Sequence, residues 1–147
     1  MLFPLSKGMK DTTVYSGYLN TYQNDRKLHY VFVQAETDPE KAPLTIWLNG
    51  GPGCSSLIGY MQEVGPYIVG DTYKFGDNLV KNEHRWNRAS NMLFIESPGG
   101  VGFSTDTNPE INYNDRQTAD DCFVAIKDFM WNVAPEFTNR ALYVQIL

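Results

Sequence analysis

Runs of apolar residues separated by polar breaks predict short strands in the first fifty positions. Residues 14–19 and 28–33 are rich in β-branched and aromatic side chains, and the polar segment 23–26 lies between them. This pattern predicts an antiparallel β-hairpin with a moderately long turn. After a second polar break at 37–40, residues 44–48 form a short continuous apolar run, which is typical of a strand buried on both faces.

Two further apolar runs enclose a helical pattern. Residues 92–95 and 141–147 are predicted strands, and the second is expected to lie centrally in its sheet. Between them, apolar residues recur at three- and four-residue steps and predict one buried helix stripe: Ala119, Cys122, Phe123, Ile126, Phe129, Met130 and Val133. Asn114 or Asp115 is a candidate N-cap, and Pro135 is expected to end the helix.

The order of strand, helix and strand predicts a parallel sheet with a crossover connection. The fold class is therefore α/β, with an antiparallel N-terminal hairpin leading into parallel strands with a crossover helix. The chain has 147 residues, enough for one domain with a sizeable core. Because function gathers at the carboxyl ends of such strands, and the run 141–147 has no loop after it, we expect an incomplete domain.

Composition excludes several classes of protein. Twelve basic and seventeen acidic residues give a formal charge of −5 without a basic cluster, which argues against nucleic acid and membrane surfaces as main partners. No apolar run is long enough to span a bilayer, and the start of the chain shows no signal peptide. The two cysteines are not spaced as a CxxC motif, so a zinc knuckle or a disulfide-dense scaffold is not expected.

Residues 49–56 form the segment with the clearest chemical potential. Gly50, Gly51 and Gly53 directly follow a predicted buried strand, and glycine lets backbone N–H groups approach a ligand without an intervening Cβ. Two such donors aimed at one point stabilise an oxyanion, and α/β-hydrolases build part of that hole in a glycine turn after an early strand. From these residues alone, a tight turn without chemistry is an equal alternative.

Several segments, in the same order, resemble the serine carboxypeptidase family, α/β-hydrolases that remove C-terminal residues from peptides. The stretch 47–57 is similar to the family signature. Further similar segments are 16–19, 28–30, 63–66, 86–87, 91–98, 100–104, 120, 129 and 135–137. The resemblance covers residues 14–144 and implies an incomplete α/β-hydrolase sheet.

The resemblance implies roles for four residues. Gly51 is the expected oxyanion-hole donor, and Gly50 supplies a second backbone N–H nearby. Asn49 and Glu63 are expected to hold the C-terminal carboxylate of a peptide substrate; without the family pattern, they are more simply a turn residue and an exposed helix residue. An ionised Glu63 would repel that carboxylate, so the pairing implies an enzyme that works in acid, in a vacuolar, lysosomal or secreted setting. The family implies no metal and no organic cofactor.

The expected nucleophile has no candidate in the sequence. No Gly-x-Ser-x-Gly segment occurs, whereas the family places this elbow directly after the strand that corresponds to 142–144. We therefore expect residues 1–147 to be the N-terminal part of the hydrolase domain, truncated before the elbow and inactive alone, with the Ser-Asp-His triad elsewhere. His29 is expected to be a structural residue in a strand, and His84 to lie in a solvated loop.

The cysteines have separate expected roles. The family implies that Cys54 forms a disulfide with a partner beyond Leu147, whereas Cys122 is expected to be a small core residue of the helix. A bridge between Cys54 and Cys122 is not expected.

Two alternatives to the peptidase stay open. One is a non-catalytic binding or decoy protein that holds peptide C-termini through Asn49, Gly50 and Glu63. The other is an acyltransferase of the same family. A fragment should aggregate through open strand edges and exposed apolar surface, whereas a decoy must fold alone.

Overall fold

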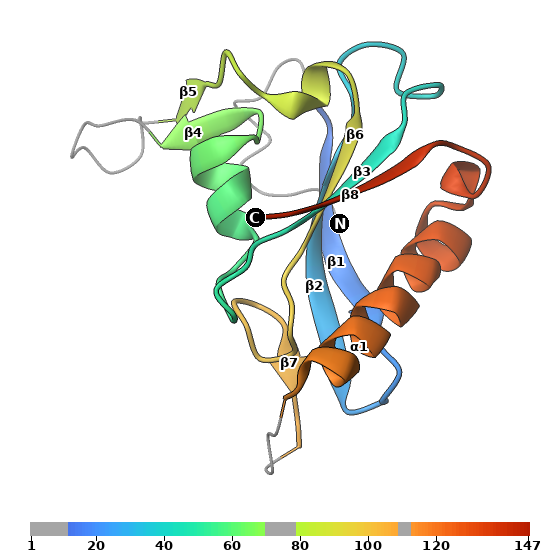
Figure 1. Ribbon diagram of the computed structural model, residues 1–147. Helices are drawn as coiled ribbons and strands as arrows, with labels where there is room; N and C mark the ends of the chain where they lie inside the picture. The colour runs from blue at the N-terminus through green and yellow to red at the C-terminus, as the bar shows by residue number, and fades with distance from the viewer. Residues whose placement is uncertain (1–11, 70–78, 109–112) are drawn as a thin grey trace.

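One mixed sheet organises the computed structural model, which describes residues 12–69, 79–108 and 113–147 (Figure 1). Its main path has the order β1-β2-β6-β3-β8. The strands are β1 (Val14–Asn20), β2 (Arg26–Val33), β3 (Leu44–Leu48), β6 (Asn91–Ile95) and β8 (Leu142–Ile146). The short strand β7 (Thr105–Asp106) pairs with the start of β2, while β4 (Tyr67–Val69) and β5 (Leu79–Lys81) form a separate antiparallel pair.

The pairing confirms the predicted hairpin and the α/β class. β1 and β2 are antiparallel from Val14 opposite Val33 to Asn20 opposite Lys27. β6 then runs antiparallel to β2 and parallel to β3, and β8 is also parallel to β3. One detail differs from the prediction: Arg26, assigned to the polar turn, starts β2 and is only 1% exposed.

β8 lies at the edge of the described sheet, so the expectation of a central strand is wrong for this structure. It pairs with β3 on one side, and Leu142, Val144 and Ile146 are 41%, 52% and 64% exposed. An apolar run predicts a strand from its own residues, but the place of that strand depends on which other segments pair with it.

The crossover helix forms where the sequence predicts it. α1 (Asp115–Asp128) begins after Asn114, whose side chain accepts a hydrogen bond from Gln117 N at 2.9 Å. A π-helical turn, Phe129–Val133, continues α1, and the helix ends before Pro135 as expected. A short 3-10 helix, Pro135–Phe137, leads toward β8.

The buried face of α1 differs from the predicted stripe. Three members of that stripe are exposed: Ala119, Phe123 and Val133. Asp121 and Asp128 lie on the buried face instead, because each has a polar partner on the hairpin. Asp121 binds Arg26, and Asp128 accepts hydrogen bonds from the backbone and side chain of Asn20 at 2.7 and 2.9 Å. Apolar periodicity alone cannot detect a helix face that includes paired carboxylates.

Helices cover both faces of the sheet, as Figure 1 shows for α1 in orange and the green helix η2 (Gly59–Glu63). Side chains alternate between the two faces along β2. Phe32 packs against Phe129, the first residue after α1, while Val31 belongs to the core on the other face of the sheet. On that second face, Tyr60 of η2 lies 5.3 Å from the ring of Phe94. Each large apolar side chain buried in this way contributes about 1.5–3 kcal/mol, so both layers hold the parallel strands in place.

Candidate active site

The glycine turn lies at the carboxyl end of β3, beside the carboxyl end of its parallel neighbour β6. Gly51 and Gly53 have φ angles of +132° and +89°, which favour glycine, and Cys54 N donates to Gly50 O at 3.2 Å. A Cβ on Gly51 would lie 3.0 Å from both the backbone nitrogen and the sulfur of Cys54. The prediction of a tight, exposed turn is therefore confirmed.

Asn49 is fixed by its side-chain oxygen at the base of this turn. Trp47 Nε1 and Gly59 N donate to Asn49 Oδ1 at 2.8 and 3.2 Å. Within the described residues, the side-chain nitrogen Nδ2 of Asn49 has no hydrogen-bond partner, and the side chain is only half-buried. The geometry therefore fixes the acceptor end of this amide and leaves its donor end available to a ligand.

Two consecutive serines fasten the turn to the end of β6. Ser56 Oγ donates to Ile95 O at 2.6 Å and accepts from Asn49 N at 3.1 Å. Ser55 Oγ donates to Glu96 Oε1 and accepts from Leu57 N at 3.1 Å. Ser56 thus binds the backbone at the end of β6, and Ser55 binds the side chain of the next residue, Glu96.

Glu96 is the residue of this site that the sequence analysis missed. Its side chain is completely buried, and Oε2 lies 2.9 Å from both Phe103 N and His29 Nδ1. Burial raises the pKa of Glu96, but the hydrogen bonds from His29, Ser55 and the Phe103 backbone outweigh burial and hold that pKa below its ordinary value. An acidic residue directly after an apolar strand and before a glycine-rich loop is the signal that could have indicated it.

The two histidines have the places expected of them. His29 lies in β2, is 7% exposed, and has its ring between those of Tyr18 and Phe103 at 5.5 and 5.3 Å. Its backbone N donates to Ser104 Oγ at 2.8 Å, so its contacts are structural. His84 is exposed in the segment before Trp86.

Glu63 lies on η2, about one helical turn beyond Gly59, the residue that contacts Asn49. The side chain of Glu63 is partly exposed, and its backbone oxygen accepts from Asn82 Nδ2 at 2.8 Å. Asn49 therefore contacts the first residue of η2, and Glu63 is the last residue of the same helix. Their role in holding a carboxylate stays a prediction.

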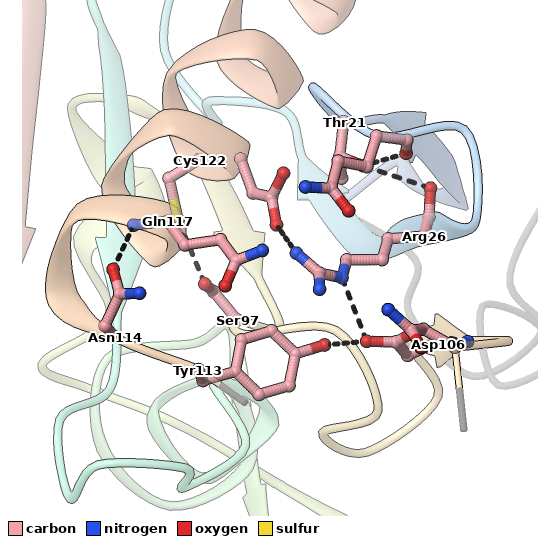
Figure 2. A network of polar contacts seen from close by, with 11 residues as sticks. Thr21, Arg26, Ser97, Asp106, Tyr113, Asn114, Gln117 and Cys122 are labelled. Carbon is pink, nitrogen blue, oxygen red and sulfur yellow. Dashed lines mark hydrogen bonds and ion pairs between the residues drawn. The ribbon is translucent and has the colours of Figure 1, made fainter. Parts of the chain in front are cut away.

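Cys54 and Cys122 are both free thiols in this structure, with no bridge between them. Cys54 is exposed on the glycine turn. Cys122 is buried on α1, 3.0 Å from Ser97 Oγ (Figure 2). Burial raises the pKa of the Cys122 thiol, and this inert environment fits a core residue. The disulfide implied for Cys54 remains a prediction.

A second buried polar cluster is centred on Arg26 (Figure 2). Arg26 Nε binds Asp106 Oδ2 at 2.9 Å, and Arg26 Nη1 binds Asp121 Oδ2 at 3.0 Å. Tyr113 donates its hydroxyl hydrogen to Asp106. Burial raises the pKa of Asp106, but these hydrogen bonds and one from Asn108 N outweigh burial and lower it. This cluster joins β2, β7 and α1, so we assign it a structural role.

The described residues contain no group of three or more His, Cys, Asp or Glu side chains arranged to hold a metal ion. In the same part of the chain, no helix is both long and apolar enough to cross a membrane.

The sheet and its covering helices match solved α/β-hydrolases. A prohormone-processing carboxypeptidase from Saccharomyces cerevisiae superposes with a TM-score of 0.78 at 23% identity, over 99% of this chain and 33% of that chain. A bacterial heroin esterase superposes with a TM-score of 0.57 at 12% identity, over 97% of this chain and 39% of that chain. At such low identities these superpositions show the fold alone, which is a partial α/β-hydrolase fold.

The sequence defines the family more closely. The family described as serine carboxypeptidase matches residues 4–145, and the chain therefore belongs to the serine carboxypeptidase family, whose members are classed as hydrolases.

Similar curated proteins include serine carboxypeptidase ctsa-4.1 of Caenorhabditis elegans, 42% identical over 88% of this chain and 27% of that protein. The lysosomal protective protein of Mus musculus is 41% identical over 88% of this chain and 26% of its own length. P-(S)-hydroxymandelonitrile lyase of Sorghum bicolor is 42% identical over 89% of this chain and 26% of that protein. The chain thus spans about a quarter of the length of these relatives.

Proposed function

We propose that this chain supplies the oxyanion turn and part of the carboxylate-binding site of a serine-type carboxypeptidase, which releases C-terminal amino acids from peptides and proteins. The observation that carries the proposal is the geometry of Gly51. It lies in an exposed turn at the carboxyl end of a parallel strand, with a positive φ angle and a backbone fastened on both sides. Family membership supports the same function.

In the proposed reaction, a serine attacks the carbonyl carbon of the C-terminal peptide bond, and a histidine carries its proton to the leaving amine. The backbone N–H group of Gly51 helps to hold the oxyanion of the tetrahedral intermediate, with the residue after the serine supplying the other donor. Losing one such donor costs about 3–4 kcal/mol of barrier. Because no Gly-x-Ser-x-Gly segment occurs in the 147 residues, we propose that the triad comes from chain outside them.

The proposed carboxylate site starts from the free end of Asn49. Its amide nitrogen donates to the substrate carboxylate, while Trp47 and Gly59 hold its oxygen. Glu63, one helical turn along η2, completes the contact in its protonated form, because an ionised carboxyl group would repel the substrate. We therefore propose activity in acid, in a lysosomal, vacuolar or secreted setting. The lysosomal protective protein among the relatives supports this setting.

Asn49→Asp tests the proposal in the protein expressed from its complete gene. The variant keeps the oxygen that accepts from Trp47 and Gly59 and replaces the Nδ2 donor with an acceptor. A hydrogen bond to a charged group contributes about 1.5–3 kcal/mol, so KM for a blocked dipeptide with a free carboxylate should rise about 10- to 150-fold. KM for the corresponding dipeptide amide should change little.

Asn139→Asp is the matched control, because it makes the same charge change at an exposed position near the start of β8. Its KM should equal that of the unmodified protein for both substrates. Equal effects of Asn49→Asp on the acid and the amide would contradict the carboxylate site. Peptide binding without release would favour the decoy alternative, and acyl transfer without peptide hydrolysis would favour the acyltransferase.

A further inference from the structure

We infer that Glu96 is a positioning residue that holds the oxyanion turn and the Phe103 loop in a fixed relation, acting through the Ser55 hydroxyl and the Phe103 backbone. The inference rests on the proposed function, because it assigns a task to a residue beneath the proposed oxyanion turn. Glu96 itself is completely buried, so its influence must pass through the groups that it binds.

The first route runs through Ser55. Its hydroxyl donates to Glu96 Oε1 and accepts from Leu57 N at 3.1 Å. One oxygen therefore connects the carboxylate, the end of the glycine turn and the helical residues that follow. If this contact is lost, the Ser55 hydroxyl keeps only its local bond from Leu57 N, and no described side-chain contact then joins Ser55 to the end of β6.

The second route runs through the loop that follows β6. Phe103 N donates to Glu96 Oε2 at 2.9 Å, and a Cβ on Gly102 would overlap Oε1. The loop backbone therefore lies directly against the carboxylate. Phe103 is 63% exposed, with its ring 5.3 Å from that of His29. Glu96 thus sets the place of an exposed aromatic side chain as well as that of the turn.

The chemistry of the cluster requires a carboxylate. Ser55 donates to one oxygen, while Phe103 N and His29 Nδ1 meet the other, and an ionised carboxylate offers only acceptors to these three groups. A glutamine has one acceptor oxygen and one donor NH₂. Its oxygen can serve either Ser55 or the Phe103 side, so Glu96→Gln must break or reverse one contact.

A separate anchor makes the inference testable. Asn49 N donates to Ser56 Oγ, which donates to Ile95 O without using the Glu96 side chain. Loss of the Ser55 contact should therefore disturb the oxyanion turn, whereas loss of the Ser56 contact should disturb Asn49. The first change should lower kcat, and the second should raise KM.

The experiment compares Glu96→Gln, Ser55→Ala, their double variant and Ser56→Ala in the protein expressed from its complete gene. We expect Glu96→Gln and Ser55→Ala each to lower kcat at least about tenfold, approaching the 10²–10³-fold loss known for removal of one oxyanion donor, at unchanged KM. Because both act along one path, the double variant should be no slower than the slower single variant. Ser56→Ala should raise KM more than it lowers kcat.

Affinity for a peptide boronic acid, which forms a tetrahedral adduct with the serine, should fall in parallel with kcat in the first three variants. Multiplied effects in the double variant, or an unchanged kcat in Ser55→Ala, would overturn the inference. Ser55→Ala decides the matter even if Glu96→Gln does not fold, because it removes a half-buried hydroxyl and leaves the carboxylate in place. Turnover by the unmodified protein separately tests the proposed function: activity without these effects overturns only the role of Glu96.

Discussion

Replacing Arg26 with methionine should destabilise the fold more than any change at an exposed charge. Arg26 is 1% exposed and binds two carboxylates, Asp106 and Asp121, whose side chains are each 1% exposed (Figure 2). Methionine keeps much of the apolar stem but removes both ion pairs. The variant therefore leaves two buried carboxylates without their shared cation.

The magnitude follows from what each carboxylate retains. Asp106 keeps its hydrogen bonds from Tyr113 and Asn108 N. Asp121 retains none in the described chain, because its Oδ1 has no partner and its Oδ2 is bound to Arg26. Removing one member of a buried pair costs about 3–5 kcal/mol. We therefore expect the melting temperature to fall by roughly 6–20 °C, at about 2–4 °C per kcal/mol for a domain near this size.

Differential scanning calorimetry of the isolated protein measures this change. Arg116→Met is the matched control, because the Arg116 side chain is 93% exposed and lies 3.9 Å from Asp120; its melting temperature should not change measurably. Adding Asp121→Leu to the Arg26→Met variant should recover much of the loss, because it removes the unpaired carboxylate. A fall after Arg26→Met no larger than that of the control would refute the assigned structural role.

Three further predictions concern the turn, acid stability and thiol chemistry. Gly51→Ala should lower kcat by about 10²–10³-fold, because the new Cβ contacts Cys54 at a positive φ angle and displaces the N–H donor. Gly100→Ala, which is also at a positive φ angle but has open space around it, should keep the kcat of the unmodified protein. Equal kcat values for the two variants would contradict this prediction. Because folding lowers the pKa of Asp106, the stability that this carboxylate contributes is complete above the unfolded pKa near 3.9 and is lost as pH falls through the folded pKa. The free energy of unfolding should therefore drop below about pH 4, and it should drop less steeply in Asp106→Asn. Equal slopes in the two proteins would argue against this role of Asp106. Cys122 should resist iodoacetamide until the protein unfolds, and rapid labelling of the native protein, located by peptide mass, would contradict its burial.

Local patterns were sufficient for the five strands of the main sheet path, for α1 and for the glycine turn, but they did not predict η2, β4, β5 or β7. The hairpin follows from two β-rich runs around a polar segment, and the turn follows from glycines that lie directly after a buried strand. Asn114 and Pro135 bound the helical region as expected, because capping and helix termination depend on the residues next to the helix.

Long-range pairing explains what the sequence did not predict. Glu96 contacts Ser55 and His29 across 41 and 67 positions, so no local pattern connects the three residues. The buried face of α1 includes Asp121 because Arg26 lies 95 positions earlier, and the edge position of β8 depends on β3. In each case, the decisive partner is distant in the chain.

The most direct test of the central claim is the release of C-terminal amino acids by the native protein. The protein would be isolated from its source with an antibody against residues 12–40 and assayed on N-blocked dipeptides in acid, before and after reaction with a serine-directed fluorophosphonate. We predict that it releases the terminal residue and that the fluorophosphonate abolishes the release. A soluble, stable species with the 16.7 kDa mass of this chain that releases nothing would contradict the account.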